Sequence, residues 1–371
     1  MKKIFHIITG IGAGGAERVL HTILANDKLN DHYVVSLKKK NFIKTPYNFN
    51  NFKILYLDLN YFNFINKFIF LIYYIKKIKP CVVQTWMYHA DFFGGMAAKF
   101  SGVKNIFWNI RNSNLDKKTK FSTKLILKIN AFLSRFLPHK IISCSKNAIK
   151  IHIKEGYKKN FIFIGNGIKK RKFYYHNNNL RLNFINKKDD FVITYAGRWH
   201  HQKDFETLFK SLKILKHTYK VYKWKIIIAG SNLDKINNDF YNLIKLNSLQ
   251  NNVILVGQLK DINKLYDISD LNVLSSSHGE AFPNVILEAM AQGVPCVSTD
   301  VGESKSIISN YGWCVEIKNP TKFAKSIYEA INLKKKLKKW NNLKFNCKMS
   351  IYRRFELNKM ISNYNQLWNK D

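Results

Sequence analysis

Paired cysteines and acidic side chains are what this 371-residue chain has least of. Its five cysteines are scattered without a C-x-x-C pair, which argues against a zinc site and favours reduced thiols in a cytoplasm. Asp and Glu number 24 against 62 Lys and Arg, a formal net charge of +38. Residues 1–185 hold 33 basic and 7 acidic side chains, against 29 and 17 in residues 186–371. We therefore expect an anionic partner at the first half.

The chain also lacks a hydrophobic run that could cross a membrane. Its most apolar window, residues 68–75, holds eight residues, whereas a transmembrane helix needs about 20. The apolar run after Lys3 stops after five residues at a glycine cluster, so it predicts a first strand and not a secretory signal. With 46% hydrophobic and 14% aromatic residues, the composition excludes a disordered chain. The length fits two domains.

Short β-branched runs alternate with amphipathic stretches along the chain. This alternation predicts the α/β class, with doubly wound parallel sheets. The pattern restarts near Phe191 after a polar, aperiodic stretch at 166–179, which we interpret as a linker. We therefore expect two Rossmann-like domains facing each other across a cleft. The expected strands are 3–8, 33–37, 81–85, 105–110 and 140–143, then 191–196, 225–229, 252–256, 271–274 and 294–298.

A glycine-rich turn follows the first expected strand. Gly10-Ile-Gly-Ala-Gly-Gly15 satisfies G-x-G-x-x-G between a strand and a helix, where backbone amides can approach a diphosphate. The second expected strand ends in Lys38-Lys39-Lys40, where an NAD site would have an acidic residue. A phosphorylated ribose would accept lysines, so an NAD(P) site and a simple strand-to-helix turn both stay open at this point.

A second loop presents two cations directly after a strand. Arg198 and Lys203 lie at the predicted carboxyl edge of a parallel strand, where α/β folds bind ligands. Arginine can hold a phosphate with two parallel hydrogen bonds. The alternative in so basic a chain is a pair of solvated loop cations. We give the adjacent His200 and His201 little weight, because neighbouring loop histidines are expected to point apart.

A third loop and helix span residues 275–295. Pro283 is placed to open the helix and Gly293 to close it, so the amides around 282–285 are predicted to be available to a phosphate. Glu280 precedes these amides. Glu288 falls among apolar neighbours, where a carboxylate needs a hydrogen-bond partner such as the hydroxyls of a ligand. An ordinary surface glutamate is the alternative.

Together these segments resemble the retaining family 4 glycosyltransferases of the GT-B fold. Glu280 and Glu288 match the E-x-seven-E signature of that family. Three more segments are similar to family motifs in the family's order: a Gly-Gly-Ala-Glu turn at 14–17, a Gly-Arg…Lys phosphate loop at 197–203, and a Pro-Asn-Gly segment at 165–167 in which the proline is lost. The stretch 86–91 resembles a subgroup assigned to surface-polysaccharide and lipid-linked glycan assembly.

The resemblance implies an acceptor-binding domain at 1–175, a nucleotide-sugar-binding domain at 186–350 and a helix at 351–371 that packs back on the first domain. It implies that Arg198 and Lys203 neutralise the departing diphosphate. Glu288 would hold the ribose hydroxyls and Glu280 the sugar. Further donor contacts that it implies are the amides of Ala281, Phe282, Asn284 and Val285, a nucleobase environment at Gly257 and Leu259, and Gly14 and Gly15 from the first domain.

The same resemblance implies transfer from a nucleotide-sugar, with UDP-sugar expected, without a metal or cofactor. The chain has no D-x-D motif at a suitable strand end, which is consistent with this. Retention would follow if the acceptor arrives on the face of the leaving group and gives its proton to the departing phosphate oxygen. Where the family often has a sugar-contacting histidine, this chain has Arg111, which is assigned to acceptor phosphate or donor sugar. His89 is the candidate to share the catalytic role of that histidine, and a capped loop histidine is the alternative.

The basic first half fits a glycan acceptor carried on a polyprenyl diphosphate. Residues 117–154 contain nine lysines and Arg135 but no acidic residue, together with apolar side chains. Such a helix can lie on anionic lipid, or it is a core helix with a basic outer face. We expect a cytoplasmic enzyme that is peripheral on the inner face of the cell membrane.

Other functions stay open from the sequence. A GT-B-fold sugar-nucleotide epimerase is the nearest alternative. An NAD(P)-dependent oxidoreductase is supported by the glycine turn alone. Nucleic-acid binding is supported only by the net charge, and no usual nucleic-acid-binding signature accompanies it, so we expect no nucleic-acid partner.

Overall fold

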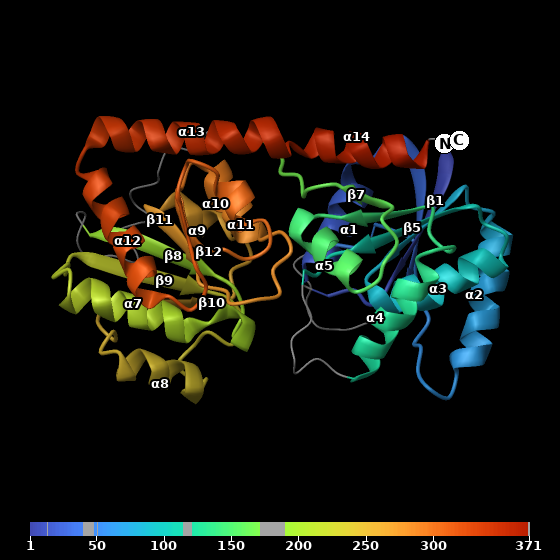
Figure 1. The fold of residues 1–371 in the computed structure, drawn as a ribbon, viewed down its shortest axis with the longest axis horizontal. Coiled ribbons are helices and arrows are strands. Elements are labelled where there is room, and N and C mark those ends of the chain that lie inside the picture. The colour runs from blue at the N-terminus through green and yellow to red at the C-terminus, as the bar shows by residue number, and fades with distance from the viewer. Residues whose placement is uncertain (13, 40–47, 50, 114–120, 171–189, 370–371) are drawn as a thin grey trace. The chain divides into compact units, whose positions relative to one another are not determined.

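The computed structural model describes residues 1–369 except 13, 40–47, 50, 114–120 and 171–189. The chain divides into two compact units (Figure 1). Unit 1 comprises Met1–Gly167 and Leu357–Asp371, and unit 2 comprises Ile168–Glu356. The linker bounds expected between 175 and 186 lie outside the described residues.

Unit 1 is built on a seven-stranded parallel sheet in the order β3-β2-β1-β4-β5-β6-β7. Side chains on successive residues of its central strand enter different cores: Ile4 and Ile8 join one apolar cluster, and Phe5 and Ile7 join another. Both faces of the sheet are therefore covered, which explains the nearly continuous apolar strands. The strands are β1 (Lys2–Ile8), β2 (Asn30–Ser36), β3 (Ile54–Tyr56), β4 (Val82–Trp86), β5 (Asn105–Ile110), β6 (Lys140–Ser143) and β7 (Phe161–Phe163).

The helices of unit 1 form a layer on each face of this sheet. Residues of α2, α3 and α4 share the cluster of Phe5 and Ile7, whereas α1 and α14 share the cluster of Ile4 and Ile8. Gly94 lets α3 approach the sheet closely, because a Cβ there would lie 2.8 Å from the Ile7 side chain. The helices are α1 (Gly15–Asn26), α2 (Phe64–Ile78), α3 (Tyr88–Phe100), α4 (Phe121–Leu133), α5 (Lys146–Lys154) and α14 (Leu357–Trp368).

The last helix, α14, returns to unit 1 through buried polar contacts. The indole nitrogen of Trp368 donates to Gln84 Oε1 at 2.9 Å. Asn30 Nδ2 donates to Asn365 Oδ1 at 2.8 Å, and Asn365 Nδ2 donates to Asp27 at 3.2 Å. A buried polar group left without a partner costs about 1–3 kcal/mol, so these contacts fix the register of α14 on unit 1.

Unit 2 holds a second parallel sheet, of six strands in the order β10-β9-β8-β11-β12-β13. Its strands are β8 (Phe191–Ala196), β9 (Trp224–Ala229), β10 (Val253–Gly257), β11 (Leu271–Leu274), β12 (Cys296–Thr299) and β13 (Trp313–Val315). A short 3-10 turn, η1 (His201–Lys203), precedes the helices α7 (Phe205–His217), α8 (Asn238–Leu246), α9 (Asn263–Asp267), α10 (Asn284–Ala291), α11 (Ser304–Ile308), α12 (Pro320–Lys334) and α13 (Leu337–Phe355). No helix in the described part of the chain is both long and apolar enough to cross a membrane.

Each sheet reverses its winding direction once. In unit 1 the chain runs from β1 outward through β2 to β3 and then returns to β4 on the other side of β1. In unit 2 it runs from β8 through β9 to β10 and then returns to β11 beside β8. The loops that follow the two central strands separate at such a point, and parallel α/β sheets bind ligands there.

Candidate functional site

The residues that sequence reasoning selected gather at these two switch points. In unit 2 the loop after β8 carries Arg198 and Lys203, and the loop after β11 carries Glu280 and leads into α10. In unit 1 the turn after β1 carries Gly14 and Gly15, and α3 begins just after β4 and holds His89 in its first turn.

The two loops at the switch point of unit 2 are hydrogen-bonded to each other. Ser275 Oγ donates to the Lys203 carbonyl at 2.7 Å, and the Ser277 amide donates to the Gln202 carbonyl at 2.8 Å. Asp204, which follows with φ 48°, caps α7 by accepting from the Thr207 amide at 3.1 Å. The loop after β8 is thus held at both ends, so its side chains are positioned before any ligand arrives.

Lys203 and Glu280 form the central charged contact of this site. Lys203 Nζ lies 2.6 Å from Glu280 Oε1, and the two side chains are 13% and 14% exposed. Ser276 Oγ donates to the same carboxylate oxygen at 2.9 Å. Burial alone would raise the pKa of Glu280, but the charge and hydrogen bond of Lys203, the hydrogen bond of Ser276 and the charge of Arg198 lower it. The site therefore holds an ionised carboxylate beside at least two cations.

Three histidines surround the same cations. The rings of His200 and His201 lie 4.2 Å apart between centroids, and the ring of His278 lies 5.1 Å from that of His201. The expectation that the two adjacent histidines point apart is wrong, because the turn η1 brings their rings together. Burial lowers the pKa of His200, and the nearby charges of Arg198, His201, His278 and Lys203 lower it further. Such a gathering of donors and positive charge suits a polyanion.

The start of α10 supplies backbone donors next to Glu280. Pro283 is the N-cap of α10, and Asn284 and Val285 are its first two residues. The first amides of a helix have no acceptor within it and lie at the positive end of the helix dipole. Ala281 and Phe282, both buried, precede the cap, and the Ala281 carbonyl accepts from the Glu303 amide at 3.0 Å.

Gly302 holds the loop around Glu280 in place from below. Its φ is +55°, and a Cβ there would lie 2.3 Å from the Glu280 carbonyl oxygen and 2.5 Å from that of Ala281. Only glycine tolerates both the backbone conformation and this close approach. The sequence gave no reason to select this position, because the contact depends on the packing of the segment after β12 against the segment after β11.

Glu288 lies inside α10 and is buried. Its side chain belongs to a residue that is only 3% exposed, so the alternative of a surface glutamate is wrong. The Tyr266 hydroxyl donates to Glu288 Oε2 at 3.5 Å, a long hydrogen bond. A carboxylate kept at this depth is costly unless it serves a ligand or a strong internal partner.

Gly257 and Leu259 lie at the end of β10, two strands from β8. The Gly230 amide donates to the Gly257 carbonyl at 2.8 Å, and the Gly197 amide donates to the Ala229 carbonyl at 3.0 Å. The carboxyl ends of β8, β9 and β10 are therefore linked in sequence. A Cβ on Gly257 would meet nothing within 4 Å, so there is open space in front of this residue.

His89 and the glycine turn share the switch point of unit 1. Gly14 is the N-cap of α1, and Gly15 is its first residue. Burial lowers the pKa of His89, and the charge of Lys38 lowers it further. The Lys38 side chain also lies against Gly10, so the lysine that weighed against an NAD site brings a cation to this edge.

Arg111 is held by protein groups within unit 1. Its guanidinium donates through Nε to Asn109 Oδ1 at 2.8 Å, through Nη1 to Asn166 Oδ1 at 2.5 Å and through Nη2 to the Tyr364 hydroxyl at 2.5 Å. It also lies over the Trp86 ring at 5.4 Å. These contacts join β5, the segment at 165–167 and α14, and they account for an arginine at this position. A ligand contact by Arg111 stays a prediction.

Sequence reasoning missed three side chains of the described site: His278, Ser276 and Lys38. His278 and Ser276 stand beside Glu280 in the chain, and their position in a loop after a buried strand was the available signal. Among the described residues, no group of three or more His, Cys, Asp or Glu side chains could hold a metal ion. The expected independence of metals and cofactors is not tested by this finding.

Comparison with known proteins identifies the second half of the chain. Residues 179–344 match the family described as "Glycosyl transferases group 1". The UDP-Gal:alpha-D-GlcNAc-diphosphoundecaprenol alpha-1,3-galactosyltransferase of Escherichia coli is 24% identical over 301 residues, which cover 79% of this chain and 76% of the relative. The capsular polysaccharide biosynthesis glycosyltransferase CapM of Staphylococcus aureus is 26% identical over 342 residues, with 89% and 88% covered.

Solved structures are similar over the whole chain. Anabaena HepE in complex with UDP and glucose superposes with a TM-score of 0.83 at 16% identity and covers 99% of both chains. Crystals of S. aureus TarM with UDP give a TM-score of 0.74 at 13% identity over 100% of both chains. At these identities the likeness concerns the fold. The chain therefore carries a glycosyl transferases group 1 domain, has the GT-B fold of two Rossmann-like domains and is a glycosyltransferase.

Proposed function

We propose that this enzyme transfers a sugar, with retention and without a metal, from a UDP-sugar to a glycan or lipid-linked acceptor in cell-surface polysaccharide assembly. Unit 2 binds the donor and unit 1 the acceptor. The observation that carries the proposal is the charged contact at the switch point of unit 2, where Lys203, Arg198 and Glu280 lie beside the start of α10. The proposal is supported by the acceptor that the name of the E. coli relative states and by the UDP bound in HepE.

The proposed chemistry follows from where charge develops. As the glycosidic bond breaks, negative charge accumulates on the diphosphate and the sugar gains oxocarbenium character. Lys203, Arg198 and the first amides of α10 stabilise the diphosphate, and because they are already fixed in place, little reorganisation is needed. Glu280, which stays ionised beside Lys203, holds the cation in position and accepts from hydroxyls of the sugar.

Retention in this scheme needs no protein nucleophile. The acceptor hydroxyl approaches on the face that the diphosphate leaves, and the departing phosphate oxygen takes its proton. His89 and Lys38 at the switch point of unit 1 then position the acceptor and its phosphate. A sugar-nucleotide epimerase would use the same donor site but would consume the donor without an acceptor.

The test is a donor screen followed by product analysis. We expect thermal stabilisation by UDP and UDP-sugars, but not by GDP- or ADP-sugars, and an equal response with Mg²⁺ or with EDTA. At about 100 times the dissociation constant, binding to the folded state adds about 2.7 kcal/mol. The anomeric configuration of the product, read by NMR, tests retention. No response to any nucleotide-sugar, or conversion of the donor without an acceptor, would contradict the proposal.

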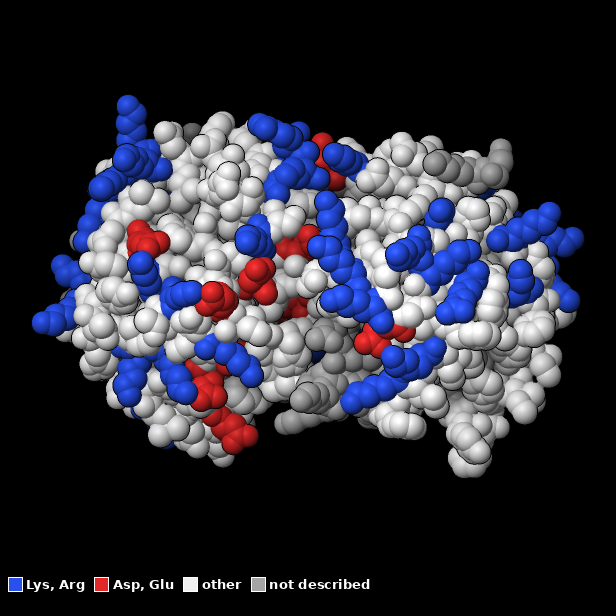
Figure 2. All heavy atoms as spheres, in the orientation of Figure 1, with Lys and Arg blue, Asp and Glu red and all other residues white. Residues whose placement is uncertain are grey.

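We also propose that unit 1 docks on an anionic membrane surface through α2. Ile65, Ile69 and Tyr73 follow each other at helical spacing and are 71%, 60% and 63% exposed, and Phe62 just before the helix is 95% exposed. From residue 59 to residue 80 the charged side chains are lysines only. Exposed apolar rows beside lysines are typical of helices that lie in a lipid interface. Figure 2 shows that basic side chains also dominate the visible face of unit 1.

Vesicle flotation tests this docking. The paired substitution of Ile65→Asp and Ile69→Asp is expected to reduce the partition coefficient onto vesicles of phosphatidylglycerol and phosphatidylcholine by about tenfold or more, because it removes apolar contact and adds negative charge. Ile236→Asp is the matched control, since Ile236 is 88% exposed in unit 2. Equal flotation of all three proteins, or equal binding to purely zwitterionic vesicles, would refute docking through α2.

A further inference from the structure

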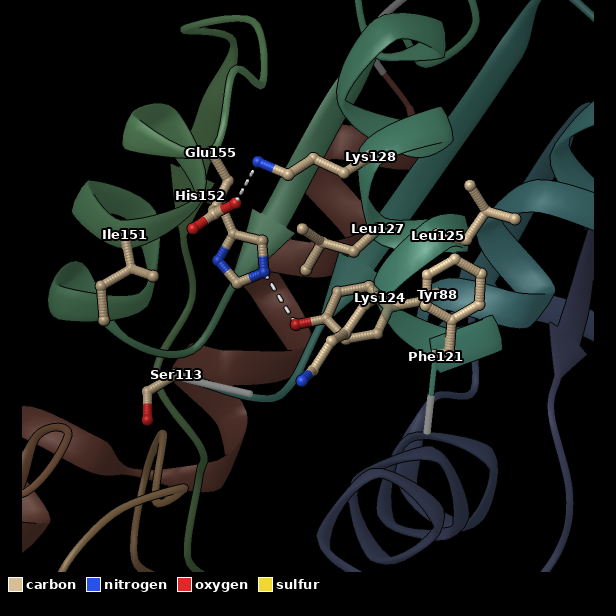
Figure 3. Close-up of a pocket in the computed structure, with 10 residues that line it drawn as sticks. All are labelled: Tyr88, Ser113, Phe121, Lys124, Leu125, Leu127, Lys128, Ile151, His152 and Glu155. Carbon is tan, nitrogen blue, oxygen red and sulfur yellow. Dashed lines mark hydrogen bonds and ion pairs between the residues drawn. The ribbon is translucent and has the colours of Figure 1, made fainter. Parts of the chain in front are cut away.

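A pocket that none of the catalytic assignments uses lies in unit 1 between α4 and α5 (Figure 3). Its volume is about 340 Å³, within the range of small-molecule sites, about 300–1,000 Å³. Most of its surface is apolar. The lining residues come from the start of α3, the segment after β5, α4 and α5: Tyr88, Ser113, Phe121, Lys124, Leu125, Leu127, Lys128, Ile151, His152 and Glu155.

The polar groups in the wall of this pocket are bonded to one another. The Tyr88 hydroxyl lies 2.8 Å from His152 Nε2, and His152 Nδ1 lies 2.7 Å from the Ala148 carbonyl. Because only a protonated Nδ1 can donate to that carbonyl, Nε2 is the acceptor for Tyr88. Burial lowers the pKa of His152, so the ring is neutral at pH 7. Lys128 Nζ pairs with Glu155 Oε2 at 2.7 Å.

These contacts decide the chemical class of the ligand. A sugar would need hydrogen-bond partners for each hydroxyl that it buries, and the Tyr88, His152 and Glu155 groups already bond within the wall. An apolar chain needs none and gains from contact with Leu125, Leu127 and the aromatic rings. The pocket is therefore suited to a hydrocarbon chain.

One end of the pocket carries positive charge and reaches the candidate acceptor site. Lys124 lies on α4 among the lining residues (Figure 3). Tyr88 comes two residues after the end of β4, and Ser113 comes three residues after the end of β5, so the pocket reaches the carboxyl edge of the seven-stranded sheet. His89, the neighbour of Tyr88 in the chain, stands at that edge. A ligand here has an apolar body and an anionic end directed to this edge.

We infer that this pocket binds the isoprenoid units next to the phosphate of a lipid-linked acceptor, with Lys124 beside the phosphate. The inference rests on the proposed function for the identity of the acceptor. It gives unit 1 a means of holding the acceptor by its lipid, so that the glycan end extends along the sheet edge toward His89.

Direct binding of farnesyl diphosphate, a short isoprenoid diphosphate, tests the pocket without any catalytic step. By calorimetry we expect it to bind more tightly than inorganic pyrophosphate, since only the isoprenoid chain can bury apolar surface. Leu125→Glu should weaken its binding by about tenfold or more, because the introduced carboxylate repels the diphosphate and must be desolvated. Lys124→Gln should weaken farnesyl diphosphate but leave farnesol unchanged.

Phe132→Glu is the matched control. Phe132 lies on the same helix, is 61% exposed and does not line the pocket, so this variant should bind farnesyl diphosphate like the parent. Equal losses in the two glutamate variants, or equal affinities for farnesyl diphosphate and pyrophosphate, would overturn the inference. Equal or tighter binding of dodecyl phosphate would assign the pocket to acyl lipids and overturn the acceptor assignment.

The proposed function and the pocket can fail separately. If farnesyl diphosphate binds as expected but the protein ignores UDP-sugars, the donor assignment fails and the pocket stands. If sugar is transferred to soluble glycans while Leu125→Glu changes neither isoprenoid binding nor the KM for a prenyl-linked acceptor, the pocket assignment fails and the transferase stands.

Discussion

Replacement of Lys203 with methionine is expected to lower kcat for sugar transfer by about 10²–10³-fold, the usual effect of removing one fixed donor from a developing oxyanion. Lys203 is the cation whose position the structure defines most closely, because its ammonium contacts Glu280 at 2.6 Å and its carbonyl accepts from Ser275. Steady-state kinetics at saturating donor measure the loss. The KM for the acceptor should change little.

The control for this substitution is another lysine–glutamate pair in the same unit. Lys210 Nζ lies 2.7 Å from Glu206 Oε1 on the surface of α7, and both side chains are more than half exposed. Exposed pairs of this kind contribute about 0.2–1 kcal/mol or less. Lys210→Met should therefore leave kcat within about twofold of the parent, and equal losses in the two variants would show that Lys203 has no special part in transfer.

Acid titration separates the catalytic role of Lys203 from its structural one. The folded-state pKa of Glu280 is lowered, so this carboxylate contributes stability above its unfolded pKa, and the contribution disappears as pH falls through the folded pKa. Without Lys203 the effect of burial dominates, the pKa rises, and the sign reverses. Acidification should then stabilise Lys203→Met relative to the parent, as measured by thermal unfolding. Adding Glu280→Gln should remove this difference in stability without restoring kcat.

The order of the elements was accessible to sequence reasoning because buried parallel strands have a local signature. Strands such as Phe191–Ala196 and Leu271–Leu274 are short apolar runs between amphipathic helices, and the structure has them at the expected residues. Their pairing is not local. β8 and β11 are neighbours in the sheet, although 74 residues separate their ends, and only this pairing brings Lys203 to Glu280.

The histidines illustrate the same limit. Whether His200 and His201 diverge depends on the turn that they adopt, and the turn η1 depends on the bond from Ser277 to the Gln202 carbonyl. The third ring, His278, comes from the other loop. Each residue was readable as a loop histidine, but their gathering results from tertiary contacts.

Arg111 shows how a family pattern can suggest a role that the local structure does not require. Its position after β5 made it a candidate for phosphate or sugar. The Tyr364 hydroxyl that it contacts is 253 residues away in the sequence, on a helix that returns to unit 1 at the end of the chain. No spacing rule connects these two positions, so sequence reasoning could not weigh a structural role for this arginine.

Replacement of Glu288 with glutamine is expected to weaken UDP binding by about 10-fold to 10²-fold, since a hydrogen bond to a charged group contributes about 1.5–3 kcal/mol. Glutamine keeps the size of the side chain, so the packing of α10 should be retained. In the proposed complex the carboxylate accepts from two ribose hydroxyls, whereas the amide has one oxygen to offer. Calorimetric titration with UDP gives the dissociation constant. The shift in melting temperature at fixed UDP should shrink in parallel.

The stability of the ligand-free protein supplies the decisive second reading for Glu288. A carboxylate that is 3% exposed and has a 3.5 Å hydrogen bond from Tyr266 is costly to bury, so Glu288→Gln should leave the melting temperature unchanged or raise it. Tyr266→Phe, which spares the carboxylate, should retain UDP binding within about threefold. Glu329→Gln is the exposed control, since Glu329 accepts only from the Trp313 indole on the surface. If Glu288→Gln lowered the melting temperature while UDP bound as in the parent, the carboxylate would be a structural group, and the ribose would have to be held elsewhere at the edge of this sheet.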